Sequence, residues 1–156
     1  MAIITKFENL EIWQLSRIQV NDFDKLVEIT LLAKDYELRN QMNASSGSVM
    51  DCIAEGFERS GNSEFKNFLI VAKGSNGEFR SQLYRCFDRK HIEKEKFDEL
   101  YTKNIALGNK IMAFIVYLQN SPIKVNGIKL KDRPNNIKPQ LSNIKPGFRD
   151  EIFLFK

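Results

Sequence analysis

The chain has 156 residues, 42% of them hydrophobic, and its 24 Lys and Arg against 20 Asp and Glu give a formal net charge of +4. This length suits one domain whose core needs neither disulfides nor metals, and the charge is too small to require a nucleic-acid partner by itself. No apolar run approaches the ~18 residues of a membrane-spanning helix. The first residues lack the pattern of a signal peptide, so we expect a cytoplasmic protein whose cysteines, Cys52 and Cys86, are reduced and buried.

Helically spaced apolar residues predict two long helices in the first half of the chain. The first spans about residues 10–33, with Asn9 as its N-cap and Trp13 as a core anchor near one end. The second spans about residues 36–58, with Asp35 as its N-cap.

Two further helices follow in the same pattern. The third begins after Asn62 or Ser63 and runs to about Arg89, and its apolar stripe is the clearest periodic signal in the sequence. The fourth spans about residues 94–118, and Pro122 cannot continue it. Four helices with short connections, and no segment that alternates like a strand, predict an all-α, antiparallel up-and-down four-helix bundle over residues 1–120.

The remaining residues, 121–156, have a different composition. They contain all four prolines of the chain, and their 8 Lys and Arg against 3 Asp and Glu give a net charge of +5. We expect a basic, mostly extended tail in which residues 152–155 (Ile-Phe-Leu-Phe) dock on a hydrophobic groove or as a strand; plain disorder is the alternative.

Five glycines fall inside predicted helices: Gly47, Gly56, Gly74, Gly77 and Gly108. Each costs about 1 kcal/mol relative to Ala in a helix interior. Close packing between helices of the bundle would offset this cost, and so would an interface with another subunit or a ligand.

The residues that could support catalysis or metal binding are few. Glu55 lies among apolar positions of the second predicted helix, where an ion pair with an arginine is favoured over a catalytic role. His91 is the only histidine, so a di-iron site of a helix bundle lacks its ligands. A Ser–His–acid triad would also need His91, and no nucleophile elbow accompanies it. No phosphate-binding or dinucleotide motif is present. We therefore expect no enzyme activity, no metal and no cofactor.

Basic residues form a stripe on the third predicted helix. Lys66, Lys73 and Arg80 recur every seven residues, and such positions drift only about 20° per repeat. Further positive charge extends the stripe toward the two ends of this helix, at Arg59, Arg85 and Arg89. Such a stripe could contact phosphates, or it could be a solvated face balanced by nearby acidic residues.

Three segments of the sequence resemble one known family. They are residues 7–14 (FENLEIWQ), residues 53–59 (IAEGFER, with Ile53, Ala54, Glu55 and Gly56) and a third-helix pattern of Glu64-Phe65, Phe68-Leu69 and Ala72-Lys73-Gly74-Ser75. In this order and spacing they resemble the four-helix-bundle proteins encoded in 23S rRNA intervening sequences, the S23 family, over about residues 7–118. Trp13 belongs to the first of these segments.

The resemblance implies a ring-forming homopentamer. Relatives of the family include an accessory protein of diversity-generating retroelements, which binds nucleic acid and a reverse transcriptase through basic surfaces. The resemblance thus implies a non-enzymatic protein that binds RNA or DNA, or alternatively a protein-interaction scaffold such as a reverse-transcriptase accessory subunit. The sequence departs from the family at residues 41–44 (QMNA), where a pair of arginines is usual, and at Met50 and Cys52, which replace a Pro and an Asn. These changes weaken the expectation of nucleic-acid binding at that surface.

Overall fold

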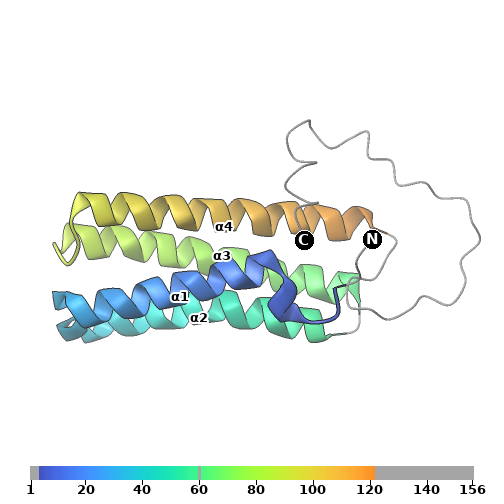
Figure 1. Ribbon diagram of the computed structural model, residues 1–156, viewed down its shortest axis with the longest axis horizontal. Coiled ribbons are helices and arrows are strands. Elements are labelled where there is room, and N and C mark those ends of the chain that lie inside the picture. Colours follow the sequence, from blue (N-terminus) through green and yellow to red (C-terminus); the bar gives the residue numbers. More distant parts are fainter. Residues whose placement is uncertain (1–3, 60, 122–156) are drawn as a thin grey trace, which may run out of the picture.

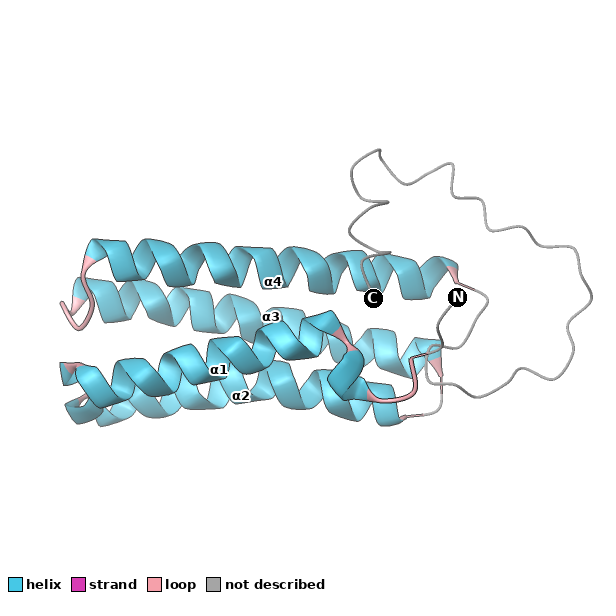
Figure 2. Cartoon of the chain, viewed as in Figure 1, coloured by secondary structure: helices cyan, strands magenta, loops and turns pink. Residues whose placement is uncertain are grey.

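Four long α-helices pack side by side in the computed structural model, which describes residues 4–59 and 61–121 (Figure 1). The elements are η1 (Phe7–Asn9), α1 (Glu11–Ile29), η2 (Leu31–Lys34), α2 (Tyr36–Glu58), α3 (Asn62–Asp88) and α4 (Lys94–Asn120). The α1–α2 and α3–α4 turns lie at one end of the bundle, and the α2–α3 turn lies at the other (Figure 1). Over the described residues all regular structure is helical (Figure 2), which confirms the predicted all-α bundle.

None of the described helices is long and apolar enough to cross a membrane. The predicted tail, with residues 152–155, lies outside the described residues.

The first helix is shorter than predicted. α1 ends at Ile29 rather than near Ala33, because Thr30 is extended (φ −128°, ψ 169°). Its Oγ1 donates to the carbonyl of Leu26 (2.7 Å) and accepts from the amide of Leu32 (3.2 Å). One hydroxyl thus closes α1 and caps η2.

The cap predicted at the start of α1 is wrong, whereas the cap of α2 is confirmed. Asn9 lies in η1, and Leu10 is the N-cap of α1, with no side-chain cap bond. Asp35 caps α2, because its Oδ1 accepts from the amide of Leu38 at 3.3 Å. α3 starts after Gly61, whose φ of 149° favours glycine.

The turn between α3 and α4 is a Schellman motif built around a lysine. The amide of His91 donates to the carbonyl of Cys86 (3.0 Å), and that of Lys90 donates to the carbonyl of Phe87 (2.8 Å). Lys90 has a φ of 59°, in the left-handed region where glycine is usual. The pattern of hydrogen bonds therefore ends α3 sharply despite an unfavourable residue at the key position.

The core consists of two apolar clusters, one toward each end of the bundle. Between them each helix contributes buried polar side chains: Gln19 from α1, Ser45 and Ser46 from α2, Asn76 from α3 and Asn104 from α4. Nδ2 of Asn104 donates to Oδ1 of Asn76 and to Oε1 of Gln19, both at 2.9 Å. We call these five residues the polar layer. Hydrogen bonds between the side-chain amides of Gln19, Asn76 and Asn104 connect α1, α3 and α4 at one level along the bundle. These bonds fix the register of the three helices.

Trp13 and the cysteines occupy different depths of this core. Trp13 is half-buried at the edge of the cluster nearer the α2–α3 turn, where Phe7 packs edge-on against it at 5.1 Å. Cys86 is fully buried, and burial raises the pKa of its thiol to about 12. Cys52 is only half-buried, and both cysteines are free thiols.

Candidate nucleic-acid interface

The three basic residues of the predicted stripe share one face of α3. Lys66, Ile70, Lys73, Gly77, Arg80 and Tyr84 follow one another at spacings of four and three residues and form what we call the α3 face. Seven residues of helix rise about 10 Å, so Lys66, Lys73 and Arg80 form a row about 20 Å long. None of these three pairs with a carboxylate of the described residues.

The part of α4 that borders this face carries no negative charge. Tyr101 of α4 lies 6.0 Å from Tyr84 between ring centroids, and Gly108 packs against Asn76, so this side of α4 adjoins α3. From Leu100 to Asn120 the helix contains no Asp or Glu. Its two lysines point the other way, toward α1.

Those two lysines form ion pairs with carboxylates of α1. Lys103 pairs with Asp22 (2.9 Å), and Lys110 pairs with Glu11 (3.0 Å). Glu64 and Glu78 of α3 are displaced from its basic face, since Glu64 precedes Lys66 and Glu78 precedes Arg80 by two residues, or about 200° around the helix. Asp88 follows Tyr84 by four residues and so continues the face beyond its last cation. From Lys66 to Arg80 the α3 face is therefore positive without local compensation.

Apolar side chains alternate with the basic ones. Ile70 is 51% exposed and Tyr84 is 47% exposed, and Met112, on the same side of α4 as Tyr101 and Gly108, is 44% exposed. The ring of Tyr84 contacts Phe97 at 4.9 Å between centroids. A hydrogen bond with Tyr101 raises the pKa of Tyr84, which keeps the phenol neutral. An exposed aromatic ring beside a row of cations offers both a stacking surface and phosphate contacts.

The other three basic residues of the prediction are held in ion pairs. Arg59 pairs with Glu55 one turn earlier and lies over the ring of Phe68 at 4.8 Å. Arg85 lies on the α2 side of α3, where its Nη1 donates to Oε1 of Gln41 at 2.6 Å. The structure thus separates Arg59, Arg85 and a further paired arginine, Arg89, from the α3 face.

Arg89 belongs to a cluster around Asp35. Oδ2 of Asp35 accepts from Nη1 of Arg89 (2.7 Å) and lies 2.9 Å from Nε2 of His91. These two partners lower the pKa of Asp35 to about 2, with help from the amide of Leu38. His91 is mostly buried at this contact. The cluster joins the N-terminus of α2 to the α3–α4 turn.

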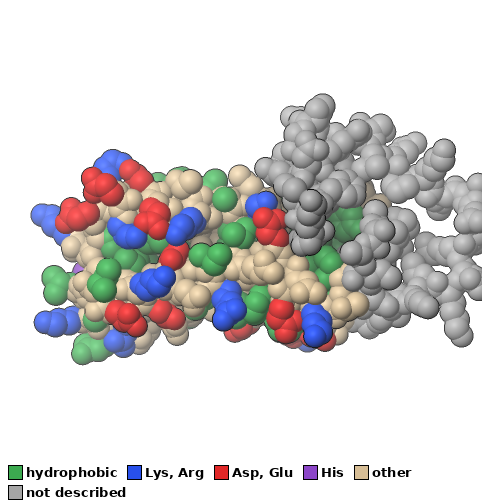
Figure 3. All heavy atoms as spheres, viewed as in Figure 1, with side chains coloured by type: hydrophobic (Ala, Val, Ile, Leu, Met, Phe, Trp, Pro, Cys, Tyr) green, Lys and Arg blue, Asp and Glu red, His purple; other side chains and the backbone are tan. Residues whose placement is uncertain are grey.

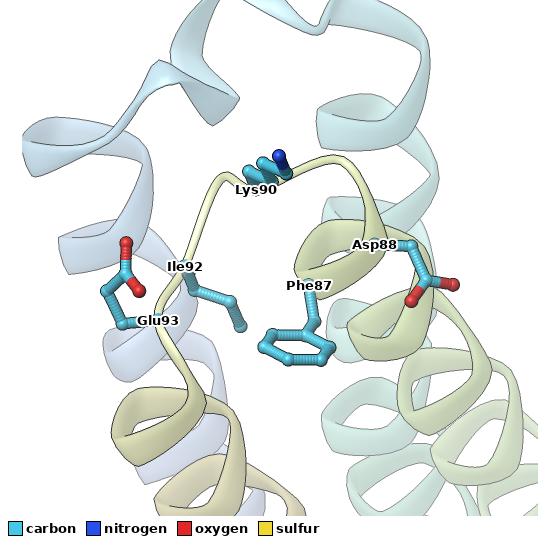
Figure 4. A pocket seen from close by; sticks show the side chains of 5 residues that line it. All are labelled: Phe87, Asp88, Lys90, Ile92 and Glu93. Carbon is cyan, nitrogen blue, oxygen red and sulfur yellow. The ribbon is translucent and has the colours of Figure 1, made fainter.

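An open hollow of about 370 Å³ lies at the same turn (Figure 4). Phe87 and Ile92 point toward each other across it, and Asp88 and Glu93 lie on opposite sides of the turn (Figure 4). Lys90 completes the lining. Because its polar groups do not converge, the hollow has no arrangement of acid, base or nucleophile. Within residues 4–59 and 61–121 no three His, Cys, Asp or Glu side chains group as metal ligands.

The motif around Glu55 is explained by the packing of α2 on α3. Ile53 is fully buried and Ala54 is half-buried. A Cβ on Gly56 would lie 2.6 Å from Cβ of Phe68, so only glycine lets the helices approach this closely. Glu55 itself is exposed in its ion pair rather than surrounded by apolar groups. Further along the same interface, Oγ of Ser75 lies 2.9 Å from Oγ of Ser48.

The remaining glycines divide into two kinds. A Cβ on Gly108 would lie 3.1 Å from Nδ2 of Asn76, which is again a close contact between helices. Gly47, Gly74 and Gly77 have no atom of a neighbouring described residue within 4 Å of the position of a Cβ. Packing within the bundle thus accounts for two of the five glycines.

Part of this site could be predicted from the sequence and part could not. The spacing of Lys66, Lys73 and Arg80 placed them together, and the absence of acids from Leu100 to Asn120 was a further signal that the sequence contained. The contribution of Tyr84 and Met112 was missed, since only the packing of α3 on α4 brings them to the same surface. Over the visible face of the molecule basic and acidic side chains are otherwise mixed (Figure 3).

Comparisons with known proteins agree with this fold. A model of the family described as 23S rRNA-intervening sequence protein matches residues 8–113, about two thirds of the chain. A search of curated proteins gave no match. The matched region runs from η1 through most of α4 and includes both the motif around Glu55 and the α3 face. The chain belongs to the family of 23S rRNA-intervening sequence proteins.

Proposed function

We propose that the chain is a non-enzymatic nucleic-acid-binding protein that acts on RNA as a homo-oligomer, through the α3 face. The observation that carries the proposal is the row of Lys66, Lys73 and Arg80, which have no carboxylate partner among the described residues and face an acid-free stretch of α4. A row of cations on one helix face is the electrostatic footprint of a surface that binds nucleic acid. Phosphates would contact the row, and Tyr84 would stack on an unpaired base.

A charge-removal experiment tests this assignment. The triple variant Lys66→Gln, Lys73→Gln and Arg80→Gln is compared with wild type by electrophoretic mobility on a structured RNA at low salt. A second triple variant, Lys6→Gln, Lys25→Gln and Lys34→Gln, removes the same net charge from exposed lysines elsewhere. We expect the first variant to lose at least tenfold in affinity and the second to lose less than threefold. Equal losses, or no RNA binding by wild type, would reject the assignment.

The second candidate function is a protein-interaction scaffold, such as an accessory subunit of a reverse transcriptase. The open positions of Gly47, Gly74 and Gly77 favour it, because a backbone of another molecule can approach a helix closely only where side chains are small. Replacing Gly74 by Arg would block such an approach while leaving the bundle itself intact. A smaller particle mass in light scattering, with unchanged RNA binding, would support the scaffold.

A further inference from the structure

We propose that residues 150–155 of this chain (Asp-Glu-Ile-Phe-Leu-Phe) bind the α3 face of the same chain and compete with nucleic acid for it. The competition rests on the proposed function, whereas the docking does not. The segment has two acidic residues followed by four large apolar ones. The α3 face carries the complementary kinds of groups, namely three cations and, beside them, exposed apolar side chains.

The complementarity applies to both charge and hydrophobicity. Lys66, Lys73 and Arg80 have no carboxylate partner among residues 4–59 and 61–121, so Asp150 and Glu151 would meet unpaired cations. Ile70 lies between Lys66 and Lys73, and Tyr84 lies one turn beyond Arg80, each about half exposed, with Met112 on the adjoining side of α4. Four consecutive apolar side chains in a basic tail would be removed from water on such a surface.

The length of the tail makes this site accessible. Residue 121 lies at the start of α3, where Nδ2 of Asn62 donates to the carbonyl of Ser121 at 3.5 Å, and Lys66 follows Asn62 by about one helical turn. Residues 122–149 separate Ser121 from Asp150. By chain statistics, a segment of this length spans on the order of 30 Å between its ends, and about 100 Å when fully extended. Each of these two distances is longer than the row from Lys66 to Arg80, which is about 20 Å long. Tethering gives the segment an effective concentration in the millimolar range, so weak binding is sufficient.

A second exposed apolar group exists but suits the segment less well. Ile29, Leu31 and Tyr36 surround the α1–α2 turn and are 63–74% exposed. Glu28 and Glu37 lie beside them in the sequence, as do Lys34 and Arg39, the latter over the ring of Tyr36 at 4.8 Å, so the charges around this turn are mixed rather than uniformly positive. This turn is also at the end of the bundle opposite to Ser121 (Figure 1). The α3 face is therefore the better acceptor.

Photo-crosslinking of the full chain tests the docking directly. Phe155→p-benzoylphenylalanine places a reactive ketone on the segment, and mass spectrometry locates the bond it forms after irradiation. We expect crosslinks within one chain to peptides that contain Ile70, Tyr84 or Met112. The same chain with Asp150→Lys and Glu151→Lys should lose at least three quarters of this yield. Crosslinks around Ile29, Leu31 and Tyr36, or between differently isotope-labelled copies, would overturn the proposal, as would a yield unaffected by the charge reversal.

RNA binding then tests the competition. The variant Phe153→Ser with Phe155→Ser removes apolar contacts without changing charge, and we expect it to bind RNA three- to tenfold more tightly than wild type. A control with Ile128→Ser and Ile137→Ser changes two apolar residues elsewhere in the tail and should bind like wild type. Unchanged or weaker binding by the first variant would exclude competition. If no variant binds RNA, the proposed function fails, while the crosslinks still decide whether the segment docks.

Discussion

Individual residues determine where the helices end and how the two turns at one end of the bundle are joined. Thr30 closes α1 through its hydroxyl, Lys90 adopts a left-handed conformation to end α3, and Asp35 caps α2 while binding Arg89. Asp35 was predicted as a cap because its position before the periodic apolar residues is a strong local signal. Thr30 was not predicted in this role because the apolar pattern of the first helix continues to Leu31. Lys90 was not predicted because a left-handed conformation is unfavourable for lysine.

The left-handed lysine leads to a stability prediction. Lys90→Gly should raise the free energy of unfolding by about 0.5–1 kcal/mol, because glycine adopts a φ near 59° without steric cost and lysine does not. The melting temperature would rise by about 2–5 °C. Calorimetry on Lys25→Gly, at an exposed position inside α1, provides the control and should show a fall of about 1 kcal/mol. A destabilised Lys90→Gly protein would contradict the interpretation of this turn.

The cluster around Asp35 predicts a dependence of stability on acid pH. The folded-state pKa of Asp35 is about 2, below the ordinary value of 3.8, so the carboxylate stabilises the fold above pH 4. This contribution decreases as the pH falls from about 4 through 2. Urea unfolding between pH 5 and 2.5 should therefore show a smaller loss of stability in Asp35→Asn than in wild type. Parallel pH profiles for the two proteins would show that Asp35 does not contribute this slope.

At the scale of whole elements, periodicity predicted the four helices, but not the polar contacts between them. The bounds of α2 match the prediction, and those of α3 and α4 match within two residues, since long periodic segments give strong signals. The polar layer could not be predicted, because asparagine is usually a surface residue, whereas Asn76 and Asn104 are buried. Only the alignment of four helices shows that they meet.

The polar layer predicts a large effect for one amide. Asn104→Ala should lower the free energy of unfolding by at least 2 kcal/mol, because it leaves buried groups of Asn76 and Gln19 without a partner. Asn109→Ala, at an exposed position of the same helix, should change it by less than about 0.5 kcal/mol. Chemical denaturation of both variants measures the difference. Similar, small effects would mean that the layer contributes little to stability.

Two glycines on neighbouring helices should respond in opposite ways to the same substitution. Gly56→Ala should destabilise the bundle by about 1–3 kcal/mol, since its Cβ would overlap Cβ of Phe68 and push α3 from α2. Gly74→Ala has open space and should stabilise the folded chain by up to about 1 kcal/mol. Thermal unfolding at low protein concentration compares them. Destabilisation by Gly74→Ala would indicate that another surface packs against this position.

At the scale of the whole molecule, the fold places a basic and apolar face on one side of a bundle whose interior consists of two apolar clusters and the polar layer. The resemblance in the sequence led to the family, and the residues that carry it serve mainly to pack α2 on α3, as Gly56 does against Phe68. The pairing of Arg59, Arg85 and Arg89 could not be predicted, because their carboxylate and amide partners depend on tertiary contacts and on side-chain conformation.

The salt dependence of RNA binding tests the role of the α3 face most directly. Each phosphate contact contributes about 0.7 to 0.9 to the slope of log affinity against log salt. The variant Lys66→Gln, Lys73→Gln and Arg80→Gln should therefore have a slope shallower than wild type by about 2 to 3, whereas the variant Lys6→Gln, Lys25→Gln and Lys34→Gln should keep the wild-type slope. Equal slopes for all three proteins would contradict phosphate binding at the α3 face.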